Sequence, residues 1–131
     1  MNGNTAECTA NVTVEDVEAP TAVCQDITIM LDAAGMQSTT AAAIDNGSAD
    51  NCGFTLAAAP LDFTCADLGA NNVTLTVTDD SGNTADCVAV VTVEDNIAPT
   101  ALCQDITVQL DATGNAAIVA ADVDGGSTDN C

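Results

Sequence analysis

The sequence predicts an all-β protein built from β-sandwich modules, and three observations carry this prediction. The chain repeats itself, because residues 3–52 and residues 82–131 are identical at 32 of 50 positions without a gap. Apolar and polar residues alternate with a period of two in segments rich in Val, Ile and Thr. The seven cysteines follow the same repeat, Cys8 with Cys87, Cys24 with Cys103 and Cys52 with Cys131.

This 79-residue period divides the chain into one whole predicted module and parts of two others. Residues 17–95 form the complete module. Residues 1–16 are expected to be the C-terminal strand of a preceding repeat, and residues 96–131 the N-terminal part of a following one. Four cysteines fall in the whole module and three in the incomplete ones, which accounts for the odd total.

Strand signals follow one another through the module. Apolar residues alternate in the first strand, at Ile27, Ile29 and Leu31, which ends at a turn over residues 32–35. The same alternation marks residues 72–79 and 87–93, and an acidic turn over residues 79–83 joins these two strands. No segment has a convincing helical period.

About seven short strands in a module of this length indicate an immunoglobulin-like sandwich of two antiparallel sheets. The chain contains only two aromatic residues, Phe54 and Phe63, and both are expected in the core. The core is otherwise built from Val, Ile, Leu and Ala. A core this thin is marginal, so disulfides are expected to supply much of the stability.

Four cysteines in one module allow three pairings. Nearness along the chain favours a bond between Cys52 and Cys65 and leaves Cys24 to bond Cys87, which joins the first and last strands. Since Cys24 is out of phase with the inward residues of the first strand, that strand must bulge or switch sheets near Gln25 and Asp26.

The charge of the chain excludes several classes of partner. Lys, Arg and His are absent, Asp and Glu number 20, and the net charge is −20. Nucleic acids and anionic membranes are recognised chiefly through Lys and Arg, so neither is expected to bind. High acidity can indicate disorder, but 47% of the residues are hydrophobic and they lie in alternating runs, which favours a folded chain.

Compartment is indicated by the cysteines and by the absence of long apolar runs. Seven cysteines without a C-x-x-C pair favour disulfides in an oxidising exterior, so we expect a secreted, extracellular or cell-surface protein. No run approaches the roughly 18 apolar residues that cross a bilayer. The N-terminus shows no secretion signal, which is expected to lie outside this sequence.

Calcium is the expected cofactor, because bound divalent cations relieve uncompensated acidic charge. Three acidic segments are expected to meet where the chain enters the module: the entering linker, the loop between strands two and three, and the loop between strands six and seven. Calcium takes six to eight oxygen ligands, and these loops do not fit the EF-hand pattern. The alternative is that the loops are solvated turns. The candidate ligands are Glu15, Asp16, Asp45, Asp50, Asn51, Asp79, Asp80 and Asn83, followed at the next junction by Glu94, Asp95, Asn96, Asp124, Asp129 and Asn130.

Other chemistry is limited. Asn11, Asn46 and Asn72 match the N-glycosylation acceptor pattern. Without His or Lys, neither a serine nor a cysteine nucleophile has its usual base, and no glycine-rich phosphate loop is present. A pair of carboxylates acting on a glycosidic bond is the remaining catalytic alternative. The sequence therefore favours a protein that is not an enzyme.

Three short motifs carry a resemblance to a known family. They are Asp-Asn-Ile-Ala-Pro at residues 95–99, Asp-Asn-Cys-Gly at residues 50–53, and Thr-Val-Thr-Asp-Asp-Ser-Gly-Asn-Thr at residues 76–84. The chain resembles hyalin-type (HYR-like) repeats and the related immunoglobulin-like repeats of giant bacterial surface adhesins, over its whole length. The resemblance implies an extracellular, many-copy protein for adhesion, surface coating or fibre formation, as in gliding-motility adhesins of Bacteroidota and in animal extracellular matrix.

The expected function is therefore a structural or adhesive module of an extracellular fibre or surface adhesin, with calcium stiffening the junctions. Expected partners are neighbouring repeats, like chains in a fibre, and other surface or matrix components. The alternative is a spacer or carbohydrate-binding accessory module of a large secreted enzyme. Sugar binding would favour exposed aromatic rings, and the sequence contains no Trp or Tyr.

Overall fold

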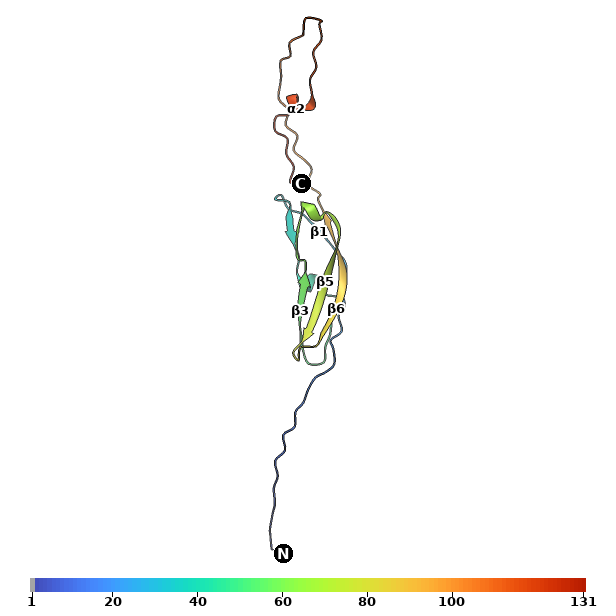
Figure 1. The fold of residues 1–131 in the computed structure, drawn as a ribbon, viewed down its shortest axis with the longest axis vertical. Coiled ribbons are helices and arrows are strands. Elements are labelled where there is room, and N and C mark those ends of the chain that lie inside the picture. Colours follow the sequence, from blue (N-terminus) through green and yellow to red (C-terminus); the bar gives the residue numbers. More distant parts are fainter. Residues whose placement is uncertain (1) are drawn as a thin grey trace.

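A computed structural model describes residues 2–131 and shows a mostly β, elongated molecule (Figure 1). The β strands gather in one body near the middle of the molecule. The N-terminal tail extends from one end of this body, and residues beyond β6 extend from the other end before the chain returns toward the body at its C-terminus.

Two sheets form the body. The larger sheet has the strand order β1-β6-β5-β3, in which β1 runs parallel to β6 and the other neighbours are antiparallel; the smaller sheet pairs β2 with β4 in antiparallel fashion. The elements are β1 (Ile27–Met30), β2 (Met36–Ser38), α1 (Ala41–Ile44), β3 (Phe54–Ala59), β4 (Asp62–Thr64), the 3₁₀ turn η1 (Cys65–Asp67), β5 (Gly69–Asp79), β6 (Thr84–Glu94) and α2 (Ala120–Val123).

The alternation in the sequence forms the inner face of the β5–β6 hairpin. Val73, Leu75 and Val77 on β5 are fully buried, and the residues between them are Thr. On β6, Ala89 and Val91 are fully buried as well. The predicted period of two is confirmed for both strands, because alternate residues of a strand point to opposite faces of the sheet.

A second layer covers this inner face. Phe63 of β4, Ile44 of α1 and Leu31 pack with the valines of β5 and β6 in one buried cluster. The single helical turn of α1 is held at its start by Thr40, whose Oγ1 accepts a hydrogen bond from the backbone N–H of Ala43. The all-β prediction is confirmed, and the two layers enclose a core of small aliphatic side chains around one aromatic ring.

The first strand was predicted to bulge or switch sheets near Gln25 and Asp26, and the structure shows a change of pairing partner there. Cys24 forms an antiparallel bridge with Asp45, whereas the residues from Ile27 onward pair with β6. Between them, Asp26 Oδ1 accepts a 2.7 Å hydrogen bond from the backbone N–H of Val90. Cys24 thereby turns inward and bonds Cys87 of β6, with 6.0 Å between the two Cα atoms.

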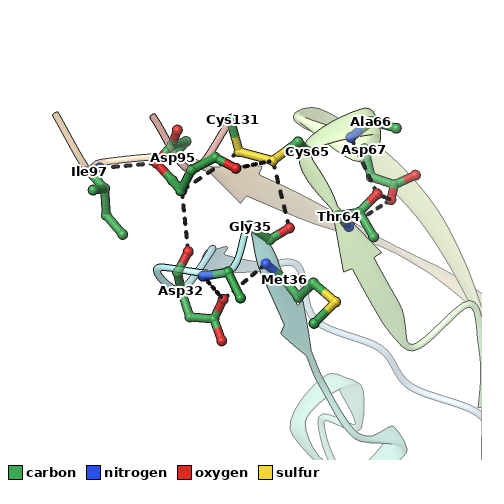
Figure 2. Close-up of a disulfide and its surroundings, with 12 residues drawn as sticks. Asp32, Gly35, Met36, Thr64, Cys65, Ala66, Asp67, Asp95, Ile97 and Cys131 are labelled. Atoms are coloured by element: carbon green, nitrogen blue, oxygen red, sulfur yellow. Dashed lines mark hydrogen bonds between the residues drawn. A yellow bond between two sulfur atoms is a disulfide. The ribbon is translucent and has the colours of Figure 1, made fainter. Parts of the chain in front are cut away.

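The predicted bond between Cys52 and Cys65 is wrong. Cys65 bonds Cys131 instead, with 5.5 Å between the Cα atoms (Figure 2), and Cys52 is unpaired. Cys52 precedes β3 and Cys65 directly follows β4, and the chain crosses the body from one end to the other in between. These cysteines are near neighbours in sequence but therefore lie at opposite ends of the body.

Two other expectations need correction. Six strands are found in the described residues, rather than about seven, because residues 21–24 make only isolated bridges to the segment after α1. Phe63 is buried as predicted, with 2% of its surface exposed, but Phe54 is 36% exposed. Phe54 begins β3, an edge strand of the larger sheet, and covers little of the inner face.

The two phenylalanines give a matched test of the core. Replacing Phe63 with Ala is expected to lower the free energy of unfolding by about 3–5 kcal/mol, because the ring leaves a cavity that the surrounding strands fill only in part. Phe54→Ala is expected to cost less than about 1 kcal/mol, as for a half-exposed edge residue. Urea unfolding of both variants measures the difference, and equal losses would contradict this description of the core.

Candidate functional site

Three acidic segments meet at the end of the body where the N-terminal segment enters. Asp16 comes from the entering segment, Asp50 from the loop before β3, and Asp79 from the end of β5. A carboxylate oxygen from each lies within 4.8 Å of the others. The sequence predicted that these three segments meet. We call the group of three carboxylates the entry carboxylates.

Asp79 is fixed by the turn between β5 and β6. Its Oδ1 accepts hydrogen bonds from the backbone N–H groups of Ser81 and Asn83, at 2.9 and 2.7 Å, and only 5% of the residue is exposed. Burial acts to raise the pKa of Asp79, but the hydrogen bonds from Asn83 and Ser81 outweigh it and hold the pKa below the ordinary value of 3.8. Asp79 is therefore ionised at neutral pH.

Asn83 fastens the entering segment to the same turn. Its Nδ2 donates to Asp79 Oδ2 at 2.7 Å and to the backbone carbonyls of Asp16 and Glu18, both at 3.2 Å. Asn51 adds a longer contact, from its Nδ2 to Glu18 Oε2 at 3.4 Å. Amide side chains thus take the place that Lys or Arg occupy in other acidic sites, and they orient the carboxylates without neutralising them.

Asp16 has unused capacity to bind a cation. Its Oδ1 accepts from the backbone N–H of Glu18 at 3.1 Å, whereas its Oδ2 is buried and has no hydrogen-bond partner. Asp50 Oδ2 accepts from the backbone N–H of Cys52 at 2.9 Å, which leaves its other oxygen free of a protein donor. A buried carboxylate oxygen without a partner is costly, and a hard cation with oxygen ligands would satisfy it.

The thiol of Cys52 lies beside the entry carboxylates. The pKa of Cys52 is raised, first by a side-chain hydrogen-bonding interaction with Asp16 and then by desolvation. The negative charges of Asp16, Asp50 and Asp79 raise it further. The thiol is thus protonated at neutral pH and a weak nucleophile. From the sequence, Cys52 was expected only to form a disulfide, although its position directly after the acidic loop could have indicated that it lies beside these carboxylates.

Asp45 and Asp124 are candidate ligands that lie outside this group. Each carboxylate holds its own turn, with Asp45 Oδ1 accepting from the backbone N–H of Ser48 at 3.0 Å and Asp124 Oδ1 from that of Ser127 at 2.9 Å. The hydroxyl and backbone donors of these serines lower the pKa of both aspartates. Asp80 lies against Gly53, and Glu15 is exposed.

The candidates at the far end of the body form a different arrangement. Asn130 Nδ2 donates to Asp95 Oδ1 at 3.1 Å and to the backbone carbonyl of Asp32 at 3.2 Å, while its Oδ1 is buried without a partner. Asn96 donates to Glu94 Oε2 at 3.3 Å, and Asp129 is exposed. The carbonyl of Asp32 was not among the predicted groups, because backbone acceptors leave no signal in a sequence.

The predicted glycosylation acceptors are all exposed. Asn11 lies on the extended N-terminal segment, Asn46 in the loop after α1, and Asn72 on β5. None of the three lies among the entry carboxylates.

Comparison with known proteins adds no family assignment: no protein family model matches the sequence, and no curated protein matches it significantly. Among residues 2–131, no helix is long and apolar enough to span a membrane.

The hydrogen bonds to Asp79 predict an acid transition. Since its pKa is lower in the folded protein than in the unfolded chain, Asp79 contributes stability that is present above the ordinary value of 3.8 and is lost as the pH falls through the folded pKa. In chelator, Asp79→Asn is expected to flatten the fall of the melting temperature between about pH 5 and pH 2.

Asp111→Asn is the matched control, because this carboxylate also holds a turn but lies in an exposed segment outside the core. The melting of the body should keep the parent's acid dependence in that variant. A steep acid transition that survives in Asp79→Asn would show that the Asp79 turn does not contribute to it.

Proposed function

We propose that the chain is a structural and adhesive part of an extracellular fibre or cell-surface adhesin. In this proposal it consists of tandem immunoglobulin-like modules with a 79-residue period, joined by calcium-stiffened junctions. The mechanism is mechanical and involves no turnover of a substrate. The observation that carries the proposal is that the same local structure occurs twice in the chain, one period apart.

Several contacts recur one period apart. The bridges Thr21–Ala49 and Cys24–Asp45 have counterparts in Thr100–Thr128 and Cys103–Asp124. The backbone N–H of Val23 donates to Ser48 Oγ at 3.0 Å, and that of Leu102 donates to Ser127 Oγ at 3.0 Å. The one-turn helices α1 and α2 are also one period apart. These pairs support a second module that begins as the first one does.

Apolar residues outside the body support incomplete modules at both ends. Leu31 is 4% exposed, whereas Leu110, its counterpart one period later, is 68% exposed. Val91 is fully buried and Val93 is 2% exposed, whereas their counterparts one period earlier, Val12 and Val14, are 85% and 90% exposed. Side chains of this size are rarely left in water along a whole strand, so the remaining strands of a module would cover them.

Calcium at the entry carboxylates would stiffen the hinge between modules. Asp16 belongs to the linker, and Asp50 and Asp79 belong to the body, so a cation held between them fixes one to the other. No cationic side chain competes for these carboxylates, because the chain contains none. Carboxylates and backbone carbonyls supply the oxygen ligands that calcium prefers, and water can complete the coordination.

Extracellular location and lack of catalysis belong to the same proposal. The two disulfides support an oxidising compartment. The composition supports partners other than nucleic acid or membrane: neighbouring repeats, like chains, and surface or matrix components. The absence of His and Lys removes the usual bases of nucleophilic catalysis.

Calcium binding is tested with two aspartates that occupy corresponding positions one period apart. Saturating calcium is expected to raise the melting temperature of the parent by roughly 10 to 20 °C relative to chelator when calcium is about 100 times Kd. Asp50→Asn should abolish most of this rise. Asp129→Asn, which changes the counterpart of Asp50 one period later, should keep it, because Asp129 is exposed and lies outside the group of three carboxylates.

Length is tested by duplicating residues 17–95 in tandem. Small-angle scattering in calcium is expected to show a rod whose maximum dimension grows by one module length, and chelator should shorten and bend it. A duplicated chain that scatters as a compact globule, or as two bodies joined flexibly in both conditions, would contradict the fibre proposal.

A further inference from the structure

The Cys65–Cys131 bond connects two segments that belong to different modules in the proposed repeat. Cys65 lies at the start of η1, at the exit end of the body, and Cys131 ends the segment that follows β6. Figure 2 shows the two sulfurs above the β1–β2 turn, close to Asp32 and Gly35 of the body. Cys131 is the counterpart of Cys52, one period later.

The body is shaped to receive the segment that carries Cys131. Cys65 Sγ lies 3.2 Å from the backbone carbonyl oxygen of Asn130, and Asn130 Nδ2 donates to Asp32 and Asp95. Gly35 is buried directly below: a Cβ at this position would lie 2.6 Å from Cys65 Sγ and 2.8 Å from the carbonyl oxygen of Asn130. A side chain at this position would therefore displace either the sulfur or the arriving backbone.

The glycine one period later lacks this surrounding. Gly114 has the same left-handed backbone, with φ +81° against +70° at Gly35, but a Cβ there would meet no atom within 4 Å. The left-handed turn favours glycine at both positions. Only at Gly35 is there also no space for a side chain. Gly35 therefore belongs to the contact between the body and the segment that carries Cys131.

We propose that a disulfide of the Cys65–Cys131 type links each module to the next. In this arrangement Cys52 forms the equivalent disulfide with the preceding module. This junction disulfide rests on the repeat organisation of the proposed function and does not depend on calcium. Cys52 is exposed and unpaired in the described chain, and it occupies the position that Cys131 occupies in its own module. Its partner is the counterpart of Cys65 in a preceding copy of the module.

The bond forms by thiol–disulfide exchange with a small-molecule disulfide such as oxidised glutathione. The thiolate of one cysteine attacks this disulfide and releases one small thiol. The thiolate of the second cysteine attacks the mixed disulfide and releases the other. Two protein thiols thereby lose two electrons and two protons, and the small-molecule disulfide becomes two thiols.

Junction disulfides would give the fibre a second covalent path. Along one path, the Cys24–Cys87 bond bypasses the body, and residues 88–102 lead from Cys87 to Cys103 of the next module. Along the other, residues 53–64 connect one junction disulfide to the next. Fully extended, this second path reaches about 45 Å per module and the first, from Cys87 to Cys103, about 55 Å, against about 270 Å for a whole period without disulfides. A pulled fibre therefore yields little length before a covalent bond carries the load.

Thiol counting tests the assignment on the chain as it is. The parent has three unpaired cysteines, which alkylation under denaturing, non-reducing conditions and intact mass spectrometry will count. Cys131→Ser should expose one more thiol than the parent, because Cys65 loses its partner and Cys52 is at the other end of the body. A bond between Cys52 and Cys65 predicts the opposite, one thiol fewer, and would overturn the proposal.

Gly35→Ala and Gly114→Ala form a matched pair for the contact. In a glutathione redox buffer, Gly35→Ala is expected to lower the equilibrium constant for the Cys65–Cys131 bond by roughly tenfold or more. Gly114→Ala places the same strain on a left-handed residue without a clash and should leave the constant at the parent value. Equal effects of the two substitutions would show that the contact around Gly35 does not support the junction.

The chain with residues 17–95 duplicated tests the junction disulfide itself. Replacing Cys52 of the second copy with Ser should expose one additional thiol, that of Cys65 in the first copy. Replacing Cys52 of the first copy should remove one thiol. The reverse pattern would overturn the proposal, whereas scattering that fails to lengthen in calcium would overturn only the calcium junction and leave these counts unchanged.

Discussion

The structure depends on how a chain without a single cationic side chain satisfies its carboxylates. With 20 acidic groups and no Lys, Arg or His, ion pairs are unavailable, and the donors must come from backbone N–H groups, hydroxyls and amides. Asp32, Asp79 and Asp111 each hold a tight turn in this way. Charge is therefore densest at the turns, which lie at the ends of the elongated body, while the β strands along its sides are rich in Thr and carry fewer carboxylates, such as those of Asp62 and Asp86.

This division explains why the ends carry the chemistry. At the entry end, Asn83 binds two linker carbonyls and one carboxylate, so the linker is oriented but its charge is retained. At the exit end, Asn130 makes the corresponding connection to Asp95 and to the β1–β2 turn, next to a disulfide. An amide side chain can donate and accept at once, so it joins acidic segments where a lysine would also neutralise them. The retained charge is what a bound cation would use.

Sequence patterns predicted the parts of the structure that depend on local alternation. The inward faces of β5 and β6 follow from Val, Leu and Ala at every second position, and the change of pairing partner near Asp26 agrees with the phase of Cys24. The meeting of Asp16, Asp50 and Asp79 followed from the expected order of loops in a sandwich.

The failures involve contacts that local patterns do not encode. Phe54 was assigned to the core because it is large, but its edge strand leaves it 36% exposed. Nearness along the chain suggested a disulfide between Cys52 and Cys65. Strands β3 and β4 lie between these cysteines, however, and carry the backbone from one end of the body to the other. The repeat already contained a warning, since Cys131 is the counterpart of Cys52 and both could compete for one partner. This pairing can be anticipated from the sequence only when the 79-residue offset is applied to the cysteines as well as to the strands.

The high negative charge also bears on how such modules would assemble. Like-charged surfaces repel within about 10 Å at 0.1 M salt, so bare sides of neighbouring modules disfavour lateral packing. In the proposed fibre, the same repulsion would act between consecutive modules, where the acidic turns lie, and there it would have to be overcome. A cation at the entry carboxylates and a covalent bond at the exit would both act at that place, one by neutralising charge and the other by a constraint that salt and pH do not remove. Repulsion along the sides combined with attachment at the ends selects a linear chain of modules over a compact cluster, which is the geometry that the proposed fibre requires.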